Sequence, residues 1–367
     1  DESRVLTVPL RVIILVSLFI MFVLKNKKRV SIGFLFFSFF IIFYYIRIFL
    51  EYLTSTNTYH IPVFDFFLYF TSFVSLPFIL LSQSKLYAKD YRYIFWSIIV
   101  GNFLFAISTI YYYGSFVGEV SRLTSTYTDL ALISPLMLAY NSVLAITIGV
   151  IYIMNNNVSG KQKYLLYITI ALSLIPFFFG ASRGSIIALI FPIFLYLIFS
   201  KDKKYRNRTI KVSMLLLIIF ALYSIYSGLG IVNRFVETFN ALSAKDYSDV
   251  RLQLWITSWD QFVDNPLFGN SLENNIYNAY PHNLFTETLI TTGIFGISCI
   301  IGFLLYVFKK ISKIIKYYPH YYYITTIFLV GFVRSLFTDG IYGHSWLAFG
   351  AAVIMAFDFK KFEKQTP

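Results

Sequence analysis

Residues 130–154 read LALISPLMLAYNSVLAITIGVIYIM, a run of 25 positions without a charged side chain. An α-helix of about 20 apolar residues crosses the roughly 30 Å hydrocarbon core of a bilayer, so this run is long enough to span a membrane. Similar runs recur along the whole chain. Eleven spans are predicted, at about 5–24, 30–50, 61–81, 93–113, 130–154, 164–180, 184–200, 210–227, 284–307, 323–337 and 345–357.

The composition agrees with these spans. Of 367 residues, 57% are hydrophobic and only 13% are charged, and the mean hydropathy is +0.67. A soluble domain carries about a quarter of its residues charged, so a soluble globule is excluded. The expected fold class is an all-α integral membrane protein, one transmembrane domain over residues 1–367 with an insertion at 228–283.

The basic residues predict how the chain is threaded. Lys-rich segments fall at every second connection between spans, and the positive-inside rule places such segments in the cytoplasm. The N-terminus is then outside and the C-terminus inside; a twelfth helix upstream of Asp1 would put both ends inside. The net charge of +13 is therefore interpreted as a topology signal and predicts no nucleic-acid partner. The segments are 25–29, 85–92, 161–163, 201–208, 309–316 and 360–364.

The insertion at 228–283 is the one long connection predicted on the external side. Its sequence suggests a short amphipathic helix from Asp249 to about residue 262, with Ser248 as N-cap. Trp255 and Trp259 are four positions apart and share a helical face. We expect both indoles at the lipid–water boundary, where tryptophan is enriched.

Arginine and lysine are distributed differently. Cytoplasmic segments and their borders hold 18 Lys and 4 Arg, whereas external and intramembrane positions hold 8 Arg and only Lys245. The planar guanidinium grips phosphate or carboxylate with two bonds, which an ammonium cannot do. Because arginine in a membrane costs about 2.5–3.5 kcal/mol on insertion scales, such residues usually face a polar cavity. The eight are Arg4, Arg11, Arg47, Arg122, Arg183, Arg234, Arg251 and Arg334.

Four of these arginines are predicted near the external ends of their helices, at positions 11, 47, 183 and 334. A ring of guanidinium groups around an outward cavity indicates an anionic ligand such as a diphosphate. The alternative is local pairing, because Glu51 lies one turn after Arg47 and Asp339 lies close to Arg334 in sequence. Arg183 has no acidic residue within ten positions.

Three fragments then occur in a characteristic order. They are GASRGS at 180–185, RLQLW at 251–255 followed by NPLFG at 265–269, and PHNL at 281–284 leading to GIFG at 293–296. Together with the helical spans and one long external loop, they resemble the O-antigen polymerase and O-antigen ligase superfamily. A weaker similarity is Arg122 shortly before a span. The resemblance covers roughly residues 115–300.

The resemblance implies an inverting, metal-independent glycosyltransferase with a GT-C-like bundle in the bacterial inner membrane, active on its periplasmic face. It implies a donor glycan on undecaprenyl diphosphate and no cofactor. A membrane protein that regulates chain length is a candidate partner. By position in the fragments, Arg183 and Arg251 match the family's diphosphate-binding arginines, joined more weakly by Arg122, and His282 matches its proposed catalytic base. Arg47, Arg334 and Arg11 are possible supporting residues.

Elementary chemistry agrees with these roles. An attacking sugar hydroxyl must lose a proton, and a neutral imidazole suits that task. Asn283 is a suitable N-cap for a helix beginning near residue 284, and the positive helix end favours uncharged His282. Glu287 could hold the imidazole or a substrate hydroxyl, and Tyr280, with Tyr277, could stack on a sugar. An interfacial capping histidine is the alternative for His282.

Other polar residues are interpreted more plainly. His344 is a secondary candidate, for which ordinary interface chemistry is favoured. The loop acids Asp249, Asp260, Asp264 and Glu273 are taken as a solvated face, although they could bind sugar hydroxyls. Cys299 is the only cysteine, and the four histidines show no metal-ligand spacing, so no metal site is predicted.

The predicted function is an O-antigen polymerase that joins undecaprenyl-diphosphate-linked oligosaccharide units. Two alternatives stay open within the superfamily: an O-antigen ligase that transfers glycan to lipid A-core, and a ligase that glycosylates proteins. A flippase for lipid-linked oligosaccharide is the alternative from another class. The long external loop and the absence of repeated halves argue against the flippase.

Overall fold

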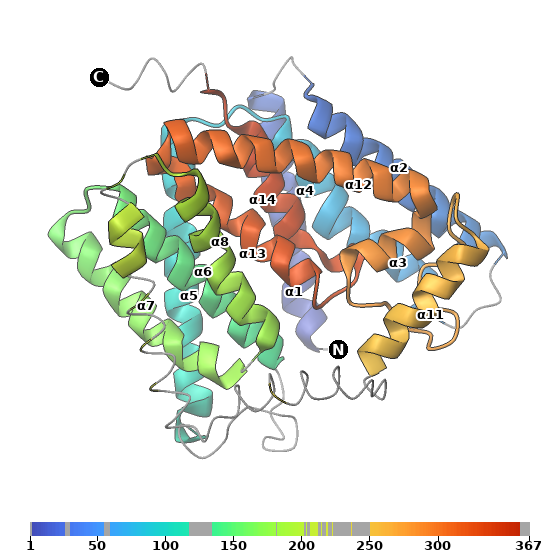
Figure 1. Cartoon of the computed structure of the whole chain (residues 1–367), viewed down its shortest axis with the longest axis horizontal. Helices are drawn as coiled ribbons and strands as arrows, with labels where there is room; N and C mark the ends of the chain where they lie inside the picture. Colours follow the sequence, from blue (N-terminus) through green and yellow to red (C-terminus); the bar gives the residue numbers. More distant parts are fainter. Residues whose placement is uncertain are drawn as a thin grey trace. The chain divides into compact units, whose positions relative to one another are not determined.

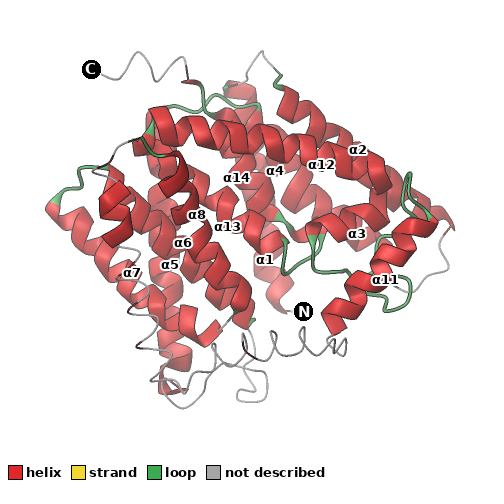
Figure 2. Cartoon of the chain, viewed as in Figure 1, coloured by secondary structure: helices red, strands yellow, loops and turns green. Residues whose placement is uncertain are grey.

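The computed structural model describes residues 2–25, 30–54, 59–116, 134–180, 182–201, 203, 206–211, 214, 218, 222, 236 and 250–359. Within these ranges the chain forms helices, with an isolated β-bridge between Asn274 and Ala279, and no strand (Figures 1 and 2). Most of the predicted span at 210–227 and of the insertion before residue 250 lies outside them. So do Arg122, Arg234, Lys245, Ser248 and Asp249.

Seven described helical segments are long and apolar enough to cross a membrane, so the chain is a multi-pass membrane protein. Two shorter apolar helices, Arg183–Phe199 and Ser345–Ala356, accompany them, and the predicted total of eleven spans stays a prediction. The helices are α1 (Glu2–Leu24), α2 (Ile32–Thr54), α3 (Val63–Tyr69), η1 (Phe70–Ser75), α4 (Leu76–Ser82), α5 (Ala88–Tyr113), η2 (Gly114–Phe116), α6 (Pro135–Asn155), α7 (Gly160–Gly180), α8 (Arg183–Phe199), α11 (Val250–Asp264), α12 (Leu284–Tyr317), η3 (Pro319–Thr325), α13 (Thr326–Ser335), η4 (Ile341–Gly343) and α14 (Ser345–Ala356).

The chain divides into two compact units. The first comprises Asp1–Tyr87, Tyr247–Ile311 and Ser335–Pro367. Its core is built from aromatic rings: Phe37 packs 4.4 Å from both Phe78 and Phe303, measured between ring centroids. Aromatic pairs at this distance add to the free energy gained by burying their apolar surface. The first unit therefore joins α2, α4 and α12 through one aromatic cluster.

The second unit comprises Ala88–Asp246 and Ser312–Arg334. Helix α6 lies at its centre, with α5, α7, α8 and η3 packed around it. Accordingly almost every side chain of α6 from Leu138 onward is buried. The Phe95 ring stacks on Tyr152 at 3.9 Å, and the buried Tyr196 hydroxyl donates a hydrogen bond to Asn155.

Helix α12 is broken near its start. Gly293 has φ 62° and ψ −155°, a conformation that essentially only glycine adopts. The break frees backbone groups that the 265–270 loop then binds: Ile294 N–H donates to Pro266 O at 2.8 Å, and Asn270 N–H donates to Ile290 O at 2.9 Å. Two of the three fragments that carry the family resemblance therefore pack directly on each other.

Replacing Gly293 by Ala is expected to destabilise the protein by about 3 kcal/mol or more. An added Cβ would lie 2.3 Å from the Leu267 carbonyl oxygen, and backbone cannot move aside cheaply. Gly101→Ala in α5 is the matched control, because nothing lies within 4 Å of its added Cβ. Thermal unfolding in detergent measures both. Equal melting temperatures for the two variants would contradict the proposed docking of the loop on the break.

Candidate functional site

His282 stands where the loop enters α12. Its backbone has φ 56°, a left-handed conformation that costs a non-glycine residue about 1–3 kcal/mol and is common at functional sites. The next residue caps the helix as predicted: Asn283 Oδ1 accepts hydrogen bonds from Phe285 N–H at 3.0 Å and Thr286 N–H at 3.2 Å. The cap fixes the loop, and with it the imidazole, at the positive end of the helix.

Aromatic rings surround the imidazole. The Tyr280 ring meets the His282 ring edge-on at 4.4 Å between centroids. Tyr280 in turn contacts Tyr342 at 5.9 Å and the exposed His60 at 6.1 Å. Burial, followed by the charges of Asp339, Glu287 and Glu273, raises the pKa of Tyr280, so its hydroxyl stays protonated. These rings give the site apolar walls with hydroxyl groups between them.

The surroundings keep His282 neutral. The pKa of His282 is lowered from 6.5 to about 4. Burial is the main cause, and the positive charge of Arg251 is the second. Asp339 acts in the opposite direction. The Nδ1 atom is buried and has no hydrogen-bond partner among the described residues. At neutral pH the site therefore holds an uncharged imidazole beside a guanidinium group.

Backbone carbonyls after α13 hold the neighbours of His282. Arg251, on α11, donates from one terminal nitrogen to Phe337 O at 3.3 Å, and the Asn283 amide donates to Leu336 O at the same distance. Trp255, one turn after Arg251, donates from its indole to Pro281 O at 2.8 Å. The Trp255 indole is therefore held by the loop, and its position at the lipid–water boundary stays a prediction.

Two buried carboxyl groups lie in the same unit. Glu287 accepts a 2.8 Å hydrogen bond from Ile341 N–H, so the structure shows it holding η4. Glu273 accepts one from His60 N–H at 2.8 Å. Both side chains are 0% exposed, and in each the second carboxyl oxygen has no partner among the described residues. The interpretation of Glu273 as part of a solvated face is wrong, because α11 and the 270–275 turn enclose it.

Glu273 makes stability depend on pH. Burial raises its pKa to about 7, against the opposing effect of the His60 N–H. The folded state then binds more protons than the unfolded state between the ordinary pKa of 4.5 and about 7, so stability falls as pH rises through this window.

Glu273→Gln is expected to remove this pH-dependent loss of stability, which is about 3 kcal/mol, because the amide cannot ionise. Melting temperatures at about pH 5 and pH 8 measure the effect. The exposed Asp264→Asn serves as control. If the pH-induced drop in melting temperature stays as large in Glu273→Gln as in the native protein, Glu273 does not carry it.

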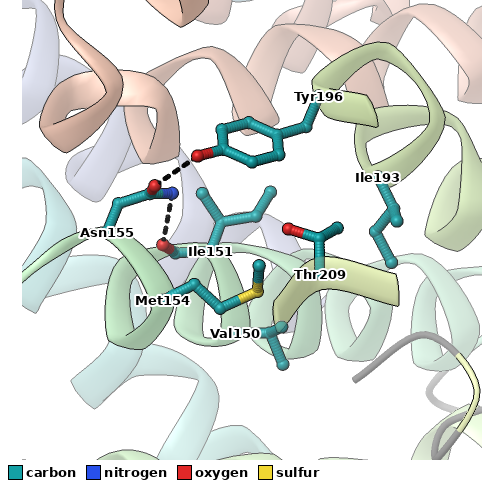
Figure 3. A pocket seen from close by; sticks show the side chains of 7 residues that line it. All are labelled: Val150, Ile151, Met154, Asn155, Ile193, Tyr196 and Thr209. Atoms are coloured by element: carbon teal, nitrogen blue, oxygen red, sulfur yellow. Dashed lines mark hydrogen bonds between the residues drawn. The ribbon is translucent and has the colours of Figure 1, made fainter. Parts of the chain in front are cut away.

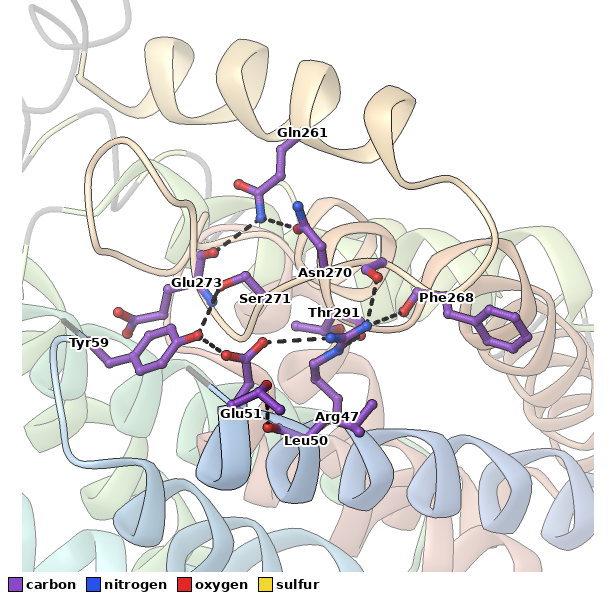
Figure 4. Close-up of polar contacts among 12 residues, drawn as sticks. Arg47, Leu50, Glu51, Tyr59, Gln261, Phe268, Asn270, Ser271, Glu273 and Thr291 are labelled. Atoms are coloured by element: carbon purple, nitrogen blue, oxygen red, sulfur yellow. Dashed lines mark hydrogen bonds and ion pairs between the residues drawn. The ribbon is translucent and has the colours of Figure 1, made fainter. Parts of the chain in front are cut away.

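Arg47 belongs to a polar network that ties α2 to the loop (Figure 4). Its Nε donates to Thr291 O at 3.0 Å, and one terminal nitrogen donates to the carbonyls of Phe268 and Gly269 at 2.9 and 2.6 Å. The other terminal nitrogen lies 3.6 Å from Glu51. All three nitrogens are thus engaged, which favours the local-pairing interpretation and a structural role.

The other predicted arginines belong to other helices. Arg11, on α1, stands over the Phe73 ring with 4.2 Å between the guanidinium carbon and the ring centroid. Arg183 and Arg334 belong to the second unit. Arg183 is the first residue of α8, and Arg334, at the end of α13, lies 5.9 Å from the Tyr140 ring centroid. The structure brings Arg251, Tyr280, His282, Asn283 and Glu287 into one unit; a pocket shared with Arg183 stays a prediction.

Sequence reasoning missed three residues of this environment. Asp339 has φ 60°, and its negative charge raises the pKa of His282. Tyr342 contacts the Tyr280 ring. His60 donates its backbone N–H to Glu273 and packs its ring against Tyr280. The Asp-Gly pair at 339–340 is a turn signal, so the sequence does mark the position of Asp339. Nothing in the sequence around Tyr342 or His60 distinguishes them from other loop residues.

A small pocket in the second unit involves none of the predicted site residues (Figure 3). Its lining is mainly apolar, and the Asn155 amide is already satisfied: it accepts a 2.6 Å hydrogen bond from the Tyr196 hydroxyl and donates one to Ile151 O at 3.0 Å. Such a pocket has no free polar group with which to orient a substrate. The lining residues are Val150, Ile151, Met154, Asn155, Ile193, Tyr196 and Thr209.

The comparison with protein families assigns this region. The model of a family described as "O-Antigen ligase" matches residues 168–301, which include Arg183, Arg251 and His282. This stretch belongs to the O-antigen polymerase and ligase superfamily. No curated protein matches the chain. This match confirms the resemblance seen in the fragments, and at the level of the family it supports an enzyme of glycosyl transfer on lipid-linked glycans.

Proposed function

We propose that the protein is an O-antigen polymerase of the bacterial inner membrane. It transfers a growing glycan from undecaprenyl diphosphate to the terminal sugar of a new lipid-linked repeat unit, on the periplasmic side. The observation that carries this proposal is the neutral His282 beside the Arg251 guanidinium, within the region that the family model matches. A base and a cation side by side are what an acceptor hydroxyl and a departing diphosphate need.

The reaction assigns each group a task. The acceptor hydroxyl attacks the anomeric carbon and gives its proton to His282; because Nδ1 is buried, Nε2 is the nitrogen that receives it. The bond from that carbon to the diphosphate oxygen breaks, and its electron pair stays on the diphosphate. Arg251 stabilises the charge that develops there. The negative charge of Asp339 stabilises the imidazolium that forms.

Arg183 is proposed as the second diphosphate ligand. It occupies the first position of α8, where the helix macrodipole disfavours a cation and favours an anion. A bound diphosphate would offset this repulsion and use the guanidinium and the helix end together. Both polymerase substrates carry a diphosphate, so more than one arginine has a role.

Turnover in detergent tests the proposal. Purified protein given a lipid-linked repeat unit should release undecaprenyl diphosphate and form a ladder of longer glycans. A flippase produces neither product, because detergent leaves no compartments to connect. Ladders of normal length from Arg183→Ala, Arg251→Ala and His282→Asn alike would refute the assigned site.

The ligase is retained as a second candidate, because the matched family carries that description. The two functions share the donor and differ in the acceptor. A gel of lipopolysaccharide from a deletion strain separates them: loss of a polymerase leaves core with one repeat unit, whereas loss of a ligase leaves bare core. Bare core would move the assignment to the ligase.

A further inference from the structure

Helix α11 presents an apolar stripe outward. Ile256, Trp259 and Val263 follow one another at spacings of three and four, so they share one face of the helix. Each is exposed, Trp259 to 55%, and the stripe continues into the exposed Leu267 and Phe268. A monomeric soluble surface rarely leaves so many large apolar side chains together.

The opposite face of α11 is fully engaged. Leu254, Ser258 and Gln261 are buried, and Gln261 donates to Asn270 Oδ1 at 2.8 Å. Asn274 donates to the Ser258 hydroxyl at 3.0 Å. Because the buried face is held by these contacts, α11 cannot rotate to bury the stripe against the rest of the protein. Something outside the chain has to cover the stripe.

The stripe is continuous with a membrane-spanning surface. The Phe268 ring stacks on Phe295 of α12 at 4.9 Å between centroids. Ile294, Phe295 and Ile301 are exposed on α12, which is long and apolar enough to cross a bilayer. Beside the stripe, Asp260 and Asp264 are exposed and charged, as expected for a helix with one face in water.

We propose that α11 is a surface-lying membrane anchor, with Ile256, Trp259, Val263, Leu267 and Phe268 embedded in lipid next to the headgroups. The occupant is the bilayer itself, because the stripe meets the exposed apolar surface of α12, a helix long and apolar enough to cross a bilayer. If the proposed function holds, embedding α11 also fixes Arg251, on the same helix, near the level at which a membrane-anchored donor carries its diphosphate.

Fluorescence quenching in bilayers tests the anchor without any need for activity. Native protein and the Trp259→Phe variant are reconstituted into phosphatidylcholine brominated either near the headgroup or near the chain end. The signal lost in the variant belongs to Trp259. It should be quenched by the shallow bromines, at a depth of about 5–10 Å below the headgroup boundary. Trp255→Phe is the matched control, because the Trp255 indole points into the loop.

Three results would overturn the anchor. The first is equal quenching of the native protein and Trp259→Phe by shallow bromines. The second is quenching of Trp259 by aqueous acrylamide and not by either lipid. The third is quenching that appears only when protein is diluted in lipid, which would mean that a second copy covers the stripe. An anchored but inactive protein would instead count against the proposed function alone.

Discussion

Replacing His282 by Asn is expected to lower the transfer rate by about 10²–10⁴-fold, the range typical for loss of a general base. Asn keeps a neutral polar side chain and tolerates the left-handed backbone at this position, so folding should be preserved. It cannot take the proton from the acceptor hydroxyl. Single-turnover rates with a lipid-linked repeat unit in detergent, together with melting temperatures, measure the effect.

His60→Asn is the matched control. The His60 ring contacts Tyr280 from an exposed position, and the hydrogen bond to Glu273 comes from its backbone, which the substitution leaves intact. We expect a much smaller loss of rate than in His282→Asn, because the exposed His60 ring contacts Tyr280 and takes no proton from the acceptor hydroxyl. A His282→Asn variant that retains most of its rate would remove the base from the proposed mechanism. Equal losses in both variants would indicate that the loop, and not the imidazole, is what matters.

Arg251→Gln is expected to lower the rate by about 10²–10³-fold, the loss seen when one donor to a developing anion is removed. It should also change the pH dependence. Protonated His282 cannot act as a base, so kcat/KM of the native protein should fall only as pH drops through about 4. Without the guanidinium charge the pKa of His282 rises, and this acid limb moves to higher pH.

The shift should stop short of the ordinary value of 6.5, because burial, the larger cause of the low pKa, remains. Arg251→Lys separates charge from geometry. It keeps the positive charge, so the limb should stay near that of the native protein, but it loses the two-pronged grip on a diphosphate, so the rate should still fall. An acid limb that stays in place in Arg251→Gln would show that the Arg251 charge does not act on His282.

Much of the fold follows from the sequence because a bilayer imposes a simple rule. A backbone that crosses lipid must satisfy its own hydrogen bonds, so a long apolar run becomes a helix. The runs at 30–50, 93–113 and 164–180 correspond to α2, α5 and α7. The cap at Asn283 was likewise predictable, since its side chain bonds to residues two and three positions further along the chain.

The site was predicted in its residue types and only partly in its surroundings. Arg251, His282 and Asn283 stand in recognisable fragments, and the structure places them in one unit. Asp339 and Tyr342 come from a segment more than fifty residues further on. Their nearness to His282 depends on how α12 and the following helices return, which no local pattern encodes. Trp255 and Trp259 looked equivalent by spacing, yet one is held by Pro281 O and the other is exposed.

The sequence by itself determined that this is a helical membrane protein, which family it resembles, and which arginines and histidine are candidates for its chemistry. Composition and local spacing suffice for those, because hydrophobicity and capping act over a few residues. Only the tertiary structure decided that Arg47 donates its hydrogen bonds to backbone carbonyls, that Glu273 is buried, and that His282 is neutral beside Arg251. Desolvation and charge act through space, between residues that the chain places far apart in sequence.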